Sequence, residues 1–104
     1  MITIKIENRN QQIVGLHISG HAGFAEYGKD LVCAGVSSIA VGLLNAIDIV
    51  ANDTCTLSMS HGDVSIKVNT ITTENQLVLQ TGVIQLETIE SQNKEFIRIK
   101  KMEV

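Results

Sequence analysis

Residues 30–51 read DLVCAGVSSIAVGLLNAIDIVA, and this apolar segment organises the strands on either side of it. Asp30 is a favoured helix N-cap and Asn52-Asp53 a suitable stop, so the segment predicts one long helix over 30–51. Its uncharged part, from Leu31 to Ile47, is shorter than the ~20 residues that a membrane span needs, and it contains serine and asparagine. We therefore expect a buried core helix.

Strand-like runs lie on both sides of this helix. They are residues 2–7, 13–19, 54–60, 64–71 and 95–104. Polar turns at 8–12 and 61–63 join the first four runs into two hairpins. In the first hairpin apolar and polar residues alternate, which is typical of antiparallel strands with one wet face. The apolar positions there include Ile2, Ile4, Ile6, Leu16 and Ile18.

A second helix is expected over 74–91, with Thr72 or Thr73 as its cap. Its inward residues are predicted to be Leu79, Val83, Leu86 and Ile89. The order β-β-α-β-β-α-β predicts a single α+β domain over residues 1–104. We expect a mixed or antiparallel sheet with two helices packed on one face.

Length, charge and cysteine content narrow the class of protein. The chain has 104 residues, a net charge of −3 and two cysteines, too few for the disulfide scaffold of a secreted protein. Its first residues read as an alternating strand and not as a signal peptide, so we expect a cytoplasmic protein. The longest basic cluster is Arg98, Lys100 and Lys101. We therefore expect no direct contact with nucleic acid and none with a membrane.

The segment GHAGFAEYGKDLVC, residues 20–33, holds the residues that could carry chemistry. If Asp30 is the N-cap, Cys33 is the third residue of the helix and lies in its first turn. Unpaired backbone N–H groups and the helix dipole favour a thiolate there, and the same amides could hold an oxyanion. His21 ends the second strand and begins a glycine-rich loop that could fold back over the helix start.

Structural roles explain the same residues without catalysis. Cys33 could be a small apolar residue of a buried helix, His21 a turn residue, and Asp30 only a cap. Ser37, one turn after Cys33, could line a site or bond its own preceding turn. Cys55 is interpreted as packing in a strand, while His17 and His61 are interpreted as solvated.

A metal site is a weaker alternative. Its ligands would be His17, His21 and Cys33, which lack the short spacing of metal-binding motifs. We therefore expect no metal and no cofactor.

The chain resembles the ribosomal-processing cysteine protease family, Prp. The matching residues are Gly20-His21-Ala22-Gly23, then Gly28 and Asp30, then Val32-Cys33-Ala34 and Val36-Ser37. Length, element order and the long helix rich in small residues agree as well. Gly35 stands where the family more often has alanine, a tolerable change on a close-packed face.

The resemblance implies an endopeptidase that removes a short N-terminal extension from large-subunit ribosomal protein twenty-seven. It implies Cys33 as nucleophile and His21 as proton acceptor and donor, with Asp30 orienting His21 or acting as a cap. Residues expected to bind substrate are Gly20, Ala22, Gly23, Phe24, Tyr27, Gly28 and Ser37, with the loop 23–29 as a lid. The resemblance also implies a homodimer, which a stripe of Gly35, Ser38, Gly42 and Ala46 permits.

Two other functions stay open from the residues alone. One is a non-catalytic module for ribosome assembly or protein binding, in which Cys33 is structural. The other is a thiol redox sensor, in which Cys33 is oxidised reversibly without peptide hydrolysis.

Overall fold

The chain folds into one five-stranded sheet and two helices, and the predicted order of elements is confirmed. The computed structural model describes residues 1–20 and 29–104, and side chains in all of these except 29 and 30. The strands are β1 Ile2–Arg9, β2 Gln12–Ser19, β3 Cys55–Ser60, β4 Asp63–Val68 and β5 Ile97–Glu103. The helices are α1 Lys29–Val50 and α2 Thr73–Gln92.

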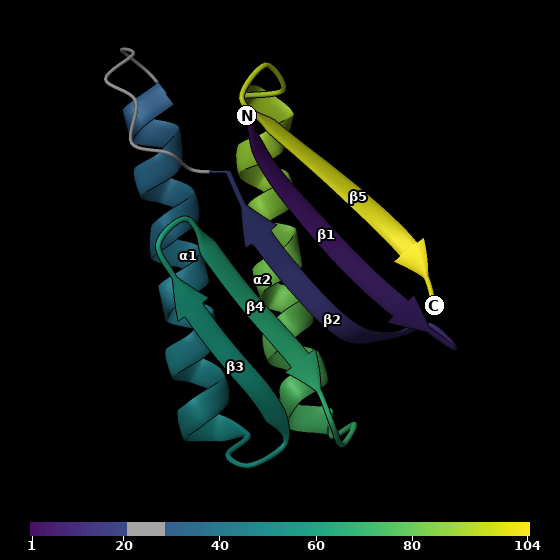
Figure 1. Cartoon of the computed structure of the whole chain (residues 1–104). Coiled ribbons are helices and arrows are strands. Elements are labelled where there is room, and N and C mark those ends of the chain that lie inside the picture. Colours follow the sequence, from purple (N-terminus) through teal and green to yellow (C-terminus); the bar gives the residue numbers. More distant parts are fainter. Residues whose placement is uncertain (21–28) are drawn as a thin grey trace.

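The sheet is mixed, with strand order β3-β4-β2-β1-β5. Neighbouring strands are antiparallel except β1 and β5, which are parallel. Figure 1 shows both helices on one face of the sheet, with the opposite face uncovered. This confirms the predicted α+β class and the placement of the helices.

The core lies between the helices and the apolar face of the sheet. Its fully buried side chains include Ile2, Ile4, Ile6, Ile18, Val36, Ile47, Ile66, Leu79, Leu86 and Ile97. The aliphatic side chains that alternate along each strand therefore all point toward the helices. Of the residues predicted to face inward on α2, Leu79, Val83 and Leu86 are buried, and Ile89 packs against the core from its edge.

The two helices contact each other through glycine on α2. A methyl group at Gly82 would overlap the Leu43 side chain of α1. The small-residue stripe predicted on α1 is used only in part: Gly35 lies against Ile89 of α2, whereas a methyl group at Gly42 would meet nothing within 4 Å.

Helix α1 is amphipathic in its packing although it is apolar nearly throughout. The segment Leu31–Val50 has a mean hydropathy of 1.8 and is long enough, by length and composition only, to cross a membrane. Only 33% of it is buried, and Ile49 on its outer side is 80% exposed. The expected core helix therefore buries one face and leaves the other in solvent. A helix that covers a sheet has the same apolar composition, so length and hydropathy alone do not establish that α1 spans a membrane.

Polar side chains fix the start of α2 against β2. Thr72 is the N-cap, and its hydroxyl accepts from the Asn75 backbone N–H while the Asn75 side chain accepts from the Thr72 backbone N–H. Next to it, Gln76 accepts from the Ile13 N–H at 2.9 Å and donates to the Ile13 carbonyl at 2.8 Å. The Gln76 amide thus satisfies both backbone groups of a residue beside the register shift in the β1–β2 ladder.

The substitution Gln76→Met tests this link. Methionine keeps the length of the side chain but leaves two buried backbone groups of Ile13 without partners. We expect the free energy of unfolding in urea to fall by about 2–4 kcal/mol. Gln80→Met, on the exposed side of the same helix, is the matched control and should change it by less than about 0.5 kcal/mol. Equal values for the two variants would show that the Gln76–Ile13 bonds contribute nothing.

Candidate active site

Cys33 lies near the start of α1, on the side that faces the core. The helix begins at Lys29, one residue earlier than predicted, so Asp30 lies inside the first turn and is not the N-cap. Cys33 is therefore the fifth helical residue and not the third. Helical side chains lean toward the N-terminus, so the Cys33 thiol still lies over the turn whose backbone N–H groups are unpaired.

The Cys33 side chain is 8% exposed and belongs to the apolar core cluster. Ser37, one turn later, is half-buried. The site is thus a nearly buried thiol at the edge of the core. It lies close to the first turn of α1, whose unpaired amides could hold an oxyanion.

Gly20 fixes the point at which the chain leaves the sheet toward this thiol. Its φ of +88° is one that side chains with a Cβ rarely adopt, and a methyl group there would overlap the Met1 carbonyl oxygen. The Gly20 N–H donates to the Gly62 carbonyl at 3.3 Å, which ties the end of β2 to the β3–β4 turn. The next residue along the chain is His21, so Gly20 sets the position from which the candidate base starts.

Most of the predicted substrate-binding loop lies outside the described residues. This holds for His21, Ala22, Gly23, Phe24, Tyr27 and Gly28, for the side chain of Asp30, and for the proposed lid over 23–29. The distance between His21 and Cys33 is therefore not part of the described geometry. The described residues of the predicted site are Gly20, Cys33 and Ser37.

An apolar groove of about 410 Å³ lies beside the site, between α1 and the β3–β4 hairpin. Its lining residues are Ile18, Ser37, Ala40, Val41, Met59, Ser60, His61, Gly62 and Val64. Ser37 belongs both to this groove and to the turn after Cys33. The sequence analysis missed the groove, because the contact between the hairpin and α1 joins residues far apart in the chain. The exposed Met59 on an edge strand was the one local sign of it.

The other cysteine and His17 do not join the site. His17 points to the uncovered face of the sheet, where its Nε2 lies 3.1 Å from Asp63 Oδ1, while Cys33 lies on the helix side. The alternative metal site of His17, His21 and Cys33 is therefore wrong, because the sheet separates His17 from Cys33. Cys55 packs against the core with its Sγ 3.6 Å from Thr54 Oγ1, as interpreted from the sequence. Within residues 1–20 and 31–104, no three metal-ligating side chains gather.

Comparison with known proteins decides the family. The family model for cysteine protease Prp matches residues 1–98. The ribosomal processing cysteine protease Prp of Staphylococcus aureus is 34% identical over 103 residues, covering 95% of this chain and 97% of its own. The chain belongs to the cysteine protease Prp family. The resemblance stated from the sequence is thereby confirmed.

Solved structures of the family agree with the fold. A crystal structure of the essential ribosomal processing protease Prp from S. aureus, in complex with a substrate peptide, has a TM-score of 0.86 and 33% identity. A second, with a covalently linked product peptide, has a TM-score of 0.85 and 36% identity. Each comparison covers 97% of this chain and 99% of the other. The family thus consists of cysteine proteases that act in ribosomal processing.

Three glycine-to-alanine substitutions separate the constraints at the end of β2. Gly20→Ala combines an unfavourable φ with overlap on Met1, Gly62→Ala has only the unfavourable φ of +81°, and Gly42→Ala has neither. We expect urea unfolding to show a loss of about 1–3 kcal/mol for Gly62→Ala, a larger loss for Gly20→Ala, and a gain of about 0.5–1 kcal/mol for Gly42→Ala. A loss at Gly20 no larger than at Gly62 would show that the Met1 contact has no effect.

Proposed function

We propose that this chain is an endopeptidase with Cys33 as nucleophile and His21 as base, and that it removes the N-terminal extension of large-subunit ribosomal protein twenty-seven. The observation that carries the proposal is the position of Cys33. Its thiol lies over the first turn of α1, where the segment bearing His21 joins the helix. A histidine and a helix N-terminus are the two surroundings that most favour a thiolate in proteins.

The chemistry follows from this arrangement. His21 takes the proton of the Cys33 thiol, and the thiolate attacks the scissile carbonyl carbon. Backbone N–H groups of the first helical turn stabilise the oxyanion, each such donor contributing about 3 kcal/mol. When the C–N bond breaks, His21 gives its proton to the leaving amine, and a thioester remains on Cys33. His21 then takes a proton from water, whose oxygen displaces the sulfur and releases the new carboxylate. Asp30, within the first turn, orients His21 in this proposal.

The apolar groove supports a substrate with an apolar side chain near the scissile bond. It begins at Ser37, one turn from Cys33, and aliphatic residues and Met59 dominate its walls. Its volume of about 410 Å³ exceeds that of one large side chain, so an extended segment fits it. The S. aureus relatives, solved with a substrate peptide and with a covalently linked product peptide, support a peptide as the substrate.

The setting of the proposed activity is the cytoplasm, where thiols stay reduced and ribosomal proteins are made. We also propose a homodimer. Gly42 of the small-residue stripe on α1 is exposed, and a methyl group there would meet nothing within 4 Å, which leaves room for a second copy.

Intact-mass measurement over time tests the nucleophile. The substrate is large-subunit ribosomal protein twenty-seven with its N-terminal extension. It is mixed with wild type or with one of three variants, Cys33→Ala, Cys55→Ala or His21→Ala. We expect wild type and Cys55→Ala to shorten it at similar rates, while Cys33→Ala and His21→Ala lose at least about 10³-fold in rate. Cys55→Ala is the matched control because both cysteines pack against the same core.

The same experiment separates the alternative functions. If every variant is folded and binds the substrate but none changes its mass, the chain is a binding module with a structural cysteine. If reversible oxidation of Cys33 changes binding without hydrolysis, it is a redox sensor.

A charge placed in the groove tests its role in substrate binding. Val41 borders the groove and is 42% exposed, whereas Ile49 lies further along the same helix, outside it, and is 80% exposed. We expect Val41→Lys to lower kcat/KM for the extension peptide roughly ten- to a hundredfold, because a lysine there removes apolar contact and brings a charge to a dry wall. Ile49→Lys should leave kcat/KM within about twofold. Similar values for both variants would remove the groove from the site.

A further inference from the structure

The uncovered face of the sheet carries a row of basic side chains that the strand register assembles. Lys5 of β1 lies directly opposite Lys100 of β5 and, on its other side, opposite His17 of β2. All three point away from the helices, because their strand neighbours are part of the core or pack against it. Like charges directly opposite each other destabilise a sheet, so the pair Lys5–Lys100 has no structural benefit of its own.

Two further cations lie in the rows on either side of this one. Arg98 is two residues before Lys100 on the same side of β5, and Lys67 lies on the same face of β4. Lys5, Lys67, Arg98 and Lys100 are exposed, and none forms a salt bridge with a carboxylate of the residues that the structure describes. We call these four side chains and His17 the basic face.

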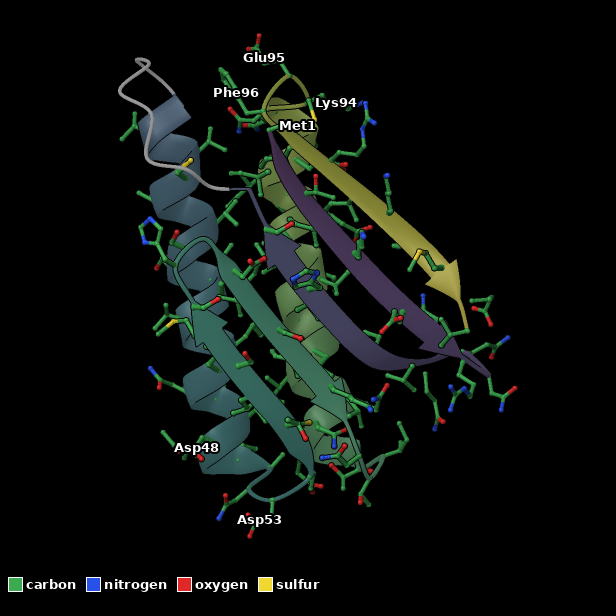
Figure 2. The ribbon with its side chains drawn as sticks, in the orientation of Figure 1. Met1, Asp48, Asp53, Lys94, Glu95 and Phe96 are labelled. Atoms are coloured by element: carbon green, nitrogen blue, oxygen red, sulfur yellow. The ribbon has the colours of Figure 1, made fainter. Side chains whose placement is uncertain are left out.

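Few carboxylates oppose the basic face. Glu7 folds over Gly15, and Asp63 pairs with His17 at 3.1 Å. The other acidic side chains of residues 1–20 and 31–104 lie on the helices or at the ends of the molecule, as Figure 2 shows for Asp48, Asp53 and Glu95. The net charge of −3 therefore hides a separation of charge between the two sides of the sheet.

We propose that the basic face binds the phosphate backbone of RNA and holds the protein on a ribosomal particle. The proposal rests on the proposed function, since a protease that trims a ribosomal protein meets its substrate among RNA phosphates. It departs from the expectation, drawn from net charge and the lack of a basic run, that the chain makes no contact with nucleic acid.

Charge and the proposed function together favour RNA over an acidic peptide. Lys5, Glu7, His17, Ser65 and Met102 line a shallow hollow of about 350 Å³ on this face, in which Lys5 is the one cation and Glu7 the one carboxylate. Lysine binds phosphate as a point charge, and the phosphates of a ribosomal particle are those of its RNA.

The strand positions of this face hold no phenylalanine, tyrosine or tryptophan on which bases could stack. Recognition is then independent of sequence and strongly dependent on salt. The face lies opposite the helix layer that carries Cys33, so bound RNA leaves the thiol accessible (Figure 1).

Fluorescence anisotropy with a labelled RNA hairpin tests the proposal. For wild type we expect the logarithm of the binding constant to fall with the logarithm of salt concentration with a slope of about −3, measured between about 50 and 200 mM. Lys5→Glu and Lys100→Glu should each weaken binding at about 50 mM salt by roughly tenfold or more, and Lys5→Gln should lower the magnitude of the slope by about 1.

Lys94→Glu is the matched control. It makes the same change of net charge in the turn before β5, at the end of the sheet (Figure 2), and should weaken binding by less than about threefold.

Three results would overturn the proposal: no binding at low salt, equal losses for Lys94→Glu and Lys100→Glu, or polyglutamate that displaces the RNA as effectively as unlabelled RNA does. The last result would assign the face to acidic protein segments. Cleavage of a short extension peptide is measured on the same variants. Because cleavage needs Cys33 and not the basic face, it separates a failure of the RNA proposal from a failure of the protease proposal. Normal cleavage by wild type without RNA binding would overturn only the tethering role, and RNA binding by wild type without cleavage would overturn only the protease.

Discussion

Both helices of this chain pack against the same face of the sheet, because that face carries the buried aliphatic side chains of β1, β2, β4 and β5. Burial of these isoleucines and valines is the main favourable free energy available to a chain with 3% aromatic residues. Two consequences follow from this packing. The side of α1 that bears Cys33 faces the core, and the opposite face of the sheet stays in solvent.

Cys33 lies in two environments at once. Its core contacts are those of a small apolar residue, whereas the turn below its thiol offers unpaired N–H groups. Burial alone would make a thiol inert, and a helix N-terminus alone would be a modest influence. The family match identifies the chain as a cysteine protease, in which the role proposed for Cys33 is that of the nucleophile.

Charge in this protein is understood only through the sheet register. Lysines at alternate positions of β1 and β5 are dispersed in the sequence, and the parallel pairing of these strands sets Lys5 opposite Lys100. The acidic residues of α2 lie on the other side of the sheet, where Glu87 pairs with Lys101 at 3.0 Å. A small negative net charge is therefore compatible with one strongly basic surface.

The sequence by itself determined the order of elements, the family, the buried side of β1 and β2 and the inward residues of α2, because these depend on short-range periodicity and local motifs. It misplaced the start of α1 by one residue, since Asp30 suits a cap and a first turn equally well. The tertiary structure alone decided the groove at Met59 and Val41, the bonds from Gln76 to Ile13, and the basic face. Each of these joins residues from strands or helices far apart in the chain, and their register is set by packing across the core, which no local pattern encodes.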